Sequence, residues 1–279
     1  MAHHHPRADL PARRRGGPRL SSRRAPDRLP GIVDSHAHLQ HARFDDDREA
    51  VLERARAAGV VRVLVPGWDL ASSEAALALA VRHPDLVHAA VGVHPHDAGD
   101  MDERSWARLE ALARDPQISA IGEIGLDYHR NLSAPDVQRE AFGRQLALAA
   151  ARGLPVLVHD REAHADVTAA LLAHPGRGIL HAFSGDAAMA ATLSEAGYLV
   201  SFALPVAFRS ASGPRAAAAS LPDGTFVVET DAPYLGPDRD RRNEPTTVLR
   251  VAAEVARLRH TAPESLVGPI GEAYRSIIG

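Results

Sequence analysis

An alternation that begins at residue 31 constrains the fold more than any other feature of this chain. Short runs rich in Val, Ile and Leu alternate with longer Ala-, Leu- and Arg-rich segments of helical period. This pattern is typical of repeated βα units, in which crossover helices join parallel strands. Eight strands are expected, at residues 31–34, 60–65, 86–93, 118–122, 155–158, 178–181, 198–201 and 226–228.

Helices are expected between these strands, at residues 46–58, 72–82, 103–114, 135–152, 162–173, 187–196, 214–219 and 245–259. Eight parallel strands in about 250 residues predict an α/β fold, a closed (β/α)₈ TIM barrel. An open, doubly wound sheet is the second possibility. The barrel is favoured because it lets the ends of several strands converge on one point, whereas the open sheet places ligands at one crevice.

Charge divides the chain into two parts. Residues 1–30 hold eight Arg and two Asp and are rich in Pro and Gly, so we expect a disordered arm there, followed by one barrel domain over residues 31–279. The whole chain carries a net charge of -3 and the arm +6, which leaves -9 for the barrel. The acidic barrel argues against a broad basic face for long nucleic acids, so any phosphate contact should be local.

Two residue types are missing, and their absence restricts the chemistry. With Cys 0 there is no disulfide, thiolate ligand or cysteine nucleophile, which fits a cytoplasmic location. All 32 cationic side chains are Arg, which excludes lysine chemistry, including a carbamylated lysine that bridges two metals. No apolar run approaches the roughly 20 residues of a membrane-spanning helix. Any metal must therefore be held by His, Asp or Glu.

Potential ligands gather at the carboxyl ends of the expected strands. His36 and His38 lie two residues apart at the end of the first strand, where side chains at i and i+2 share one face. Five further strands end in His or a carboxylate: His94 and His96, Glu123, His159, His181, and Asp231. Each alone has an ordinary explanation, such as a hydrogen-bonded histidine or a helix cap. Active sites of such barrels lie at the carboxyl ends of the strands, so these residues together predict a metal centre there.

This inventory is large enough for two divalent ions about 3.5–4 Å apart. Glu123, in the middle of the barrel, is the available bridge because the chain has no lysine. Several imidazoles with carboxylates suit Zn, Mn or Fe, whereas Mg prefers oxygen ligands.

Six runs in order, DSHAHL, GVHPH, GEIGLDY, LPVLVHDR, HAFSG and ETDAPYL followed by RRNEP, resemble the TatD family of metal-dependent deoxyribonucleases. The resemblance covers about residues 31–260. It implies a TIM barrel, a two-metal site with Mg-supported activity, and hydrolysis of DNA, typically as an exonuclease. It also implies that one ion is held by His36, His38, Glu123 and Asp231, and the other by Glu123, His159 and His181. The chain departs from the family pattern at Asp160 and Ala182, neither of which is a ligand position.

The resemblance places His94 where the family has an additional active-site histidine, in contact with the substrate phosphate or the leaving group. Asp231 is expected to orient or deprotonate the attacking water. Arg130, Arg161 and Arg242 are candidate phosphate clamps, because arginine can grip phosphate with two hydrogen bonds. The alternative for each arginine is a solvated surface position.

The predicted activity is hydrolysis of DNA phosphodiester bonds, on single strands or ends that are bound locally. Tyr128 and Tyr234 are candidates for stacking on a base, although such tyrosines more often pack in the protein. A second enzyme hypothesis is a barrel hydrolase that uses the same dinuclear site on a small ester, lactone or amide. A third is a non-catalytic metal-binding or scaffold protein, against which the complete ligand set argues. The sequence predicts no membrane partner and is compatible with a monomer.

Overall fold

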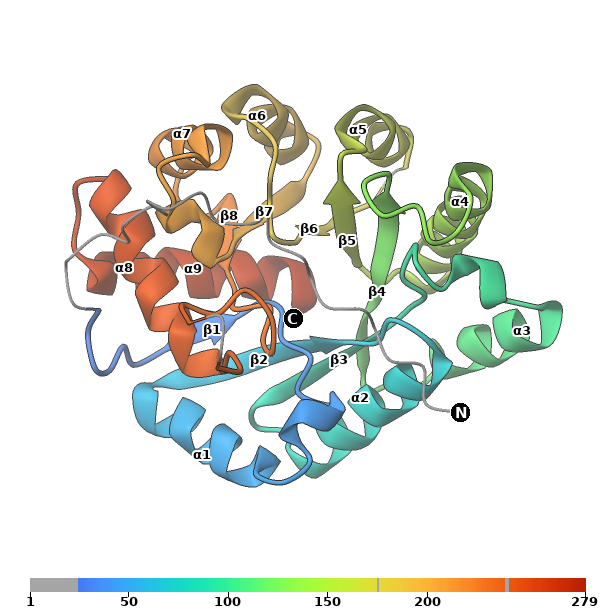
Figure 1. Ribbon diagram of the computed structural model, residues 1–279, viewed down its shortest axis with the longest axis horizontal. Helices are drawn as coiled ribbons and strands as arrows, with labels where there is room; N and C mark the ends of the chain where they lie inside the picture. Colours follow the sequence, from blue (N-terminus) through green and yellow to red (C-terminus); the bar gives the residue numbers. More distant parts are fainter. Residues whose placement is uncertain (1–24, 175, 239–240) are drawn as a thin grey trace.

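The computed structural model describes residues 25–174, 176–238 and 241–279. Eight strands form one parallel sheet in sequential order, as Figure 1 shows. They are β1 (Ile32–Asp34), β2 (Val60–Pro66), β3 (Val87–Val91), β4 (Ile118–Asp127), β5 (Val156–Arg161), β6 (Gly178–Leu180), β7 (Tyr198–Phe202) and β8 (Phe226–Val228). All eight expected strands are present.

The segments that follow β1 and β8 bring the two edges of this sheet together. The Asp231 amide donates to the His36 carbonyl at 2.9 Å, and the His38 amide donates to the Ala232 carbonyl at 2.6 Å. Ala37 and Ala232 form an isolated parallel bridge. The sheet therefore nearly closes into a barrel, which confirms the predicted fold over the open sheet.

Eight helices follow the strands and surround the barrel in Figure 1. They are α1 (Arg48–Ala58), α2 (Leu70–Arg82), α3 (Glu103–Leu112), α4 (Pro135–Arg152), α5 (His164–Ala173), α6 (Ala187–Glu195), α7 (Ser212–Ser220) and α8 (Val248–Leu258). Short 3₁₀ helices are η1 (Ala42–Phe44), η2 (Ala98–Asp100), η3 (Leu204–Ala207) and η4 (Pro245–Thr247). The helix expected at 245–259 is thus divided into η4 and α8.

A further helix, α9 (Pro263–Ile278), was not predicted. Pro269 and two glycines interrupt its helical pattern in the sequence, and tertiary packing overrides these weak local signals. The helix lies at the amino-terminal end of the strands, where Arg177, just before β6, donates its Nε to the Ile277 carbonyl at 3.3 Å.

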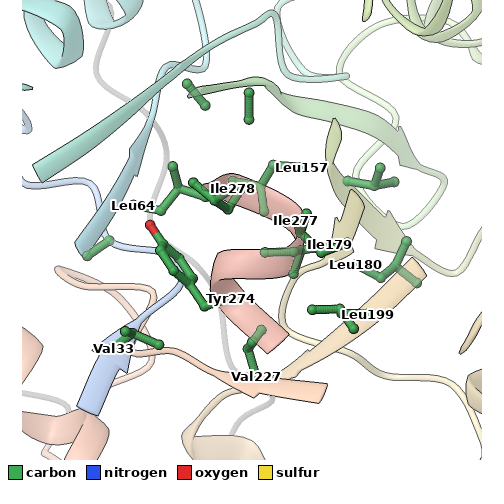
Figure 2. Packing of buried hydrophobic residues seen from close by; sticks show 14 of the residues in the cluster. Val33, Leu64, Leu157, Ile179, Leu180, Leu199, Val227, Tyr274, Ile277 and Ile278 are labelled. Carbon is green, nitrogen blue, oxygen red and sulfur yellow. The ribbon is translucent and has the colours of Figure 1, made fainter. Parts of the chain in front are cut away.

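Apolar side chains of α9 fill this end of the barrel. Figure 2 shows Tyr274, Ile277 and Ile278 pointing from α9 into the ring of strands. The residues around them lie on the strands and include Val33, Leu64, Leu157, Ile179, Leu199 and Val227. This end is therefore closed by packing.

Strands β4 and β5 are longer than expected, and their length positions the site. Gly125 has a φ of 137°, and a Cβ there would collide with the backbone carbonyl of His159 on β5, so the two strands approach closely. Glu123, Asp127 and His159 consequently lie within strands, whereas the sequence predicted Glu123 and His159 to follow them.

Residues 1–24, which hold most of the expected arm, lie outside the described residues. The packed chain begins two residues earlier than expected, because Leu29 is buried and its amide donates to the Ala58 carbonyl at 2.8 Å. Across the described part of the chain, no helix combines the length and apolar character needed to cross a membrane.

Candidate metal centre

A cleft of about 560 Å³ opens at the carboxyl ends of the strands. Most of the predicted site residues line it, namely His38, His94, His96, Glu123, Arg130, His159, Arg161, His181 and Asp231. His36 is fully buried below them. The structure therefore collects in one place side chains from β4, β5 and the segments after β1, β3, β6 and β8.

Four polar atoms form a first donor group on one side of Glu123. The Nε2 atoms of His36 and His38 are 3.1 Å apart. They lie 3.5 Å and 3.4 Å from Glu123 Oε2, and 3.7 Å and 3.6 Å from Asp231 Oδ1. The first donor group thus contains two imidazole nitrogens and two carboxylate oxygens.

A second donor group surrounds the other oxygen of the same carboxylate. Glu123 Oε1 lies 3.1 Å from His159 Nδ1 and 2.9 Å from His181 Nε2. These two nitrogens are 3.0 Å apart. Glu123, only 3% exposed, therefore presents one oxygen to each donor group.

The spacing and chemistry of both groups fit divalent cations. Nitrogen and oxygen ligands at about 2.1 Å from a tetrahedral ion lie roughly 3.4 Å from one another, close to the separations found here. Imidazole and carboxylate are the donors that Zn, Mn and related ions accept. His36, His38 and Glu123 each bring one possible ligand atom to within 4.8 Å of the other two.

In His38 and His181, the ring nitrogen that points away from Glu123 lies near a hydrogen-bond acceptor. His38 Nδ1 faces the Pro66 carbonyl at 3.2 Å, and His181 Nδ1 faces Glu229 Oε1 at 3.3 Å. An acceptor at Nδ1 places the proton there and leaves the Nε2 lone pair free for a metal. In this tautomer both rings turn an Nε2 lone pair toward Glu123.

His94 has the opposite arrangement. Its Nδ1 accepts the backbone N–H of His96 at 3.1 Å, so in the neutral ring the proton is on Nε2, which lies 3.5 Å from Glu123 Oε1. His94 also lies close to Glu123 and His159, but its ring presents a hydrogen-bond donor to the cleft. This arrangement distinguishes His94 from His38 and His181, whose Nδ1 atoms lie near acceptors.

Burial and neighbouring charges shift the pKa values of Glu123, Asp231 and His36 in different directions. Burial would raise the pKa of Glu123, but the nearby His181, His94 and His36 hold it well below its usual range. Burial raises the pKa of Asp231 to about 7, against the opposing charges of His181 and His38. Burial also lowers the pKa of His36 to about 4, which keeps this ring in the neutral form that a metal requires.

Two buried carboxylates that support the ligands were not predicted. Glu229 Oε1 accepts the Ala182 amide at 2.9 Å in addition to facing His181. Asp127 Oδ2 accepts from His96 Nε2 at 2.7 Å and lies 3.5 Å from His159 Nε2. Both residues stand inside the runs ETDAPYL and GEIGLDY, so the motifs contained the signal, but the sequence did not show which carboxylates point inward.

Asp34 joins the two segments that carry the first donor group. Its carboxylate accepts the Thr230 amide at 2.9 Å, the Thr230 hydroxyl at 2.6 Å and the His36 amide at 3.3 Å. These bonds fix the backbone just before Asp231 relative to the backbone of His36. Asp34 is fully buried and belongs to the support of the site.

The three candidate arginine clamps occupy different positions. Arg130 and Arg161 line the cleft. Arg242 does not line it: its guanidinium bonds Asp47 at 2.7 Å and 2.9 Å and Glu244 at 3.0 Å, and it lies over the Phe44 ring. The structure thus brings two of the three arginines to the site and pairs the third with carboxylates.

Comparison with known proteins agrees with these observations. A family model described as TatD related DNase matches residues 33–279. The chain is 38% identical to an uncharacterized metal-dependent hydrolase, YabD, of Bacillus subtilis over 84% of this chain and 94% of that protein. It is 38% identical to a 3'-5' ssDNA/RNA exonuclease, TatD, of Dickeya dadantii over 88% of this chain and 97% of that protein.

Solved structures show the same architecture. The crystal structure of YJJV, a TatD homologue from Escherichia coli K12, matches with a TM-score of 0.83 and 29% identity, over 88% of this chain and 97% of that one. A TatD family hydrolase from Entamoeba histolytica matches with a TM-score of 0.80 at 18% identity, over 90% of this chain and 99% of that one, which supports the fold alone. From the family model and the close relatives together, this chain belongs to the TatD related DNase family.

Proposed function

We propose that the chain is a metal-dependent nuclease that hydrolyses phosphodiester bonds from the ends of single-stranded DNA. The observation that carries the proposal is Glu123, whose two oxygens face two separate donor groups at the floor of a cleft lined by arginines. Relatives named 3'-5' ssDNA/RNA exonucleases support the substrate class and the attack at an end, and they make RNA a second substrate to test.

The proposed ligand sets follow the two donor groups. His36, His38, Glu123 and Asp231 would hold one ion, and Glu123, His159 and His181 the other, with Mg, Mn or Zn as candidates. Bound divalent ions would supply Lewis-acid stabilisation of the phosphoryl oxygens and would lower the pKa of a water molecule. The cysteine-free composition makes the cytoplasm the proposed location.

Three kinds of side chain act on the substrate in this proposal. Asp231 orients the attacking water through its cleft-facing carboxylate. His94 Nε2 donates a hydrogen bond to a phosphate oxygen or the leaving oxygen. Arg161 and Arg130 bind the phosphate. Arg161 is the last residue of β5, the strand that carries His159.

Hydrolysis of a small ester, lactone or amide is less favoured. Such neutral substrates would not need two guanidinium groups beside the donor groups, and the relative from Dickeya dadantii is named an ssDNA/RNA exonuclease. The acidic barrel remains compatible with nuclease activity if only a few phosphates are contacted.

Replacement of Arg161 tests the phosphate-binding part of the proposal. We expect Arg161→Gln to raise KM for a short single-stranded oligonucleotide about tenfold at low salt with a smaller change in kcat, because a charge-assisted phosphate contact contributes roughly 1.5–3 kcal/mol. Arg82→Gln, at an exposed position at the end of α2, removes the same charge far from the cleft and should leave KM unchanged. Equal KM values for wild type and Arg161→Gln, together with turnover of lactones or esters, would contradict the proposal.

A further inference from the structure

The cleft has an aromatic side that the proposed chemistry does not use. Trp68, just after β2, and Tyr234, after β8, both line it. The Trp68 ring is T-shaped to His38 with centroids 5.2 Å apart, and the Tyr234 ring is T-shaped to the same imidazole at 5.9 Å. His41 lies 5.9 Å from each of the two rings. The two aromatic rings therefore flank the first donor group.

The arginines lie on a different side of the cleft. The aromatic side follows β8 and β2, which neighbour β1 around the barrel, whereas Arg130 follows β4 and Arg161 ends β5; Figure 1 shows the order of these strands. Glu123 and its donor groups lie between them. A substrate at the centre would thus meet aromatic faces on one side and guanidinium groups on the other.

The aromatic residues are held in place by their backbone and not by packing of the ring alone. The Trp68 amide donates to Ser72 Oγ at 2.8 Å, and the Trp68 carbonyl accepts the His94 amide at 2.8 Å. The Tyr234 amide donates to the Asp231 carbonyl at 2.7 Å. Within the described part of the chain, the Tyr234 hydroxyl has no hydrogen-bond partner, which leaves it available to a ligand.

Tyr128, the other tyrosine near this face, is arranged differently. It does not line the cleft, and its hydroxyl donates to Asp166 Oδ2 at 2.6 Å and accepts from Arg139 Nη1 at 3.1 Å. The Tyr128 hydroxyl is thus hydrogen-bonded to other side chains of the protein surface. The comparison separates a structural tyrosine from one that faces the reaction centre.

We propose that Trp68 and Tyr234 form a subsite that stacks on the base of the terminal nucleotide, while Arg130 and Arg161 hold the phosphate on the side of the remaining strand. This inference rests on the proposed nuclease function and adds how the substrate lies. Aromatic stacking accepts every base, because each base has a π face. The subsite therefore favours an end that carries a base without selecting its sequence.

Tryptophan fluorescence tests the subsite without depending on catalysis. The chain has two tryptophans, Trp68 in the cleft and Trp106 in the core on α3. In full-length Trp106→Phe protein, whose fold is checked by circular dichroism, deoxyadenosine 5′-monophosphate should quench the emission of Trp68. Deoxyribose 5-phosphate, which lacks the base, should not. Equal responses to both ligands, or no response to the nucleotide, would overturn the proposal.

Kinetics with matched oligonucleotides test the same subsite during turnover. Two single strands that differ only in a terminal nucleotide, base-bearing or abasic, should differ about tenfold in kcat/KM with wild-type protein. Trp68→Leu and Tyr234→Leu should reduce this ratio toward one while cleavage of the abasic strand persists, and Trp68→Phe should restore it. Tyr128→Leu removes a ring outside the cleft and should keep the wild-type ratio.

The outcomes separate the subsite from the nuclease assignment. If Trp68→Leu lowers cleavage of both strands equally, the ring has only a structural role and the subsite is wrong. If the nucleotide quenches Trp68 but no metal supports cleavage of either strand, the base-binding subsite stands and the proposed function fails.

Discussion

The two ends of the barrel are built from opposite chemistry. At the amino-terminal end, α9 inserts Tyr274, Ile277 and Ile278 into the ring of strands (Figure 2). At the carboxyl-terminal end, Glu123 and the four histidines around it lie at a cleft of about 560 Å³. The difference shows how one sheet can separate stability from chemistry: the packed end stabilises the barrel, so the other end can bury groups that repel one another and favour a bound cation.

Removal of Glu123 should produce the largest effect of the variants, and this effect should be confined to metal binding and activity at the carboxyl-terminal end. We expect Glu123→Ala to lose both metal equivalents and to lower nuclease activity by about 10³-fold or more, because the metals supply several kcal/mol of transition-state stabilisation. Metal analysis and end-labelled digestion measure the two losses. Glu140→Ala, which removes an exposed carboxylate on α4, is the control and should behave as wild type. Two ions retained by Glu123→Ala would show that this residue is not the bridge.

Tyr274, Ile277 and Ile278 form an apolar plug at the amino-terminal end. Truncation of this plug should lower stability and leave the metal centre unchanged. Ile277→Ala should lower the free energy of unfolding by about 2–4 kcal/mol, the usual cost of a buried cavity, while the folded fraction keeps its metal content and activity. Urea denaturation measures the stability. Leu172→Ala on α5, where the side chain is 51% exposed, should change it by less than about 0.5 kcal/mol. If Ile277→Ala releases metal from folded protein, the stability of one end and the chemistry of the other are not independent.

A smaller, pH-dependent effect should arise beside the plug. His88 Nδ1 lies 3.0 Å from the Tyr274 hydroxyl, and burial, with a contribution from Arg62, lowers the pKa of His88 to about 4. Because the folded pKa is below the unfolded value of 6.5, the folded state disfavours the proton. His88 therefore contributes its full stability above pH 6.5 and loses it as the pH falls toward 4.

The variant His88→Gln isolates this contribution from the titration of the metal centre. Between pH 7 and pH 4.5, wild type should lose about 1–2 kcal/mol more than His88→Gln in urea denaturation. Parallel losses in the two proteins would mean that His88 is not buried in its neutral form.

The sequence predicted the strands and the gathering of His and carboxylate side chains at their carboxyl ends, because these signals are local. His36 and His38 adjoin a short apolar strand, and Asp231 follows another, so strand order alone brought them to one face. Helix α9 was missed because Pro269 and neighbouring glycines obscured it, and its packing comes from strands far along the chain.

Non-local contacts account for the rest of what the sequence did not reveal. Arg242 pairs with Asp47, 195 positions away, and no local pattern announces such a partner. Glu229 and Asp231 are two residues apart and chemically similar, yet Glu229 lies beside His181 while Asp231 belongs to the first donor group. Only the path of the backbone after β8 separates these two roles.

Digestion of end-labelled single-stranded DNA, with and without chelator, tests the central claim most directly. The claim predicts that the labelled strand shortens stepwise with Mg or Mn. Chelator should stop this shortening, and restored metal should return it. Glu123→Ala should not shorten the strand under any of these conditions. Shortening that persists in chelator, or that Glu123→Ala retains, would contradict a metal centre built on Glu123 as the source of the activity.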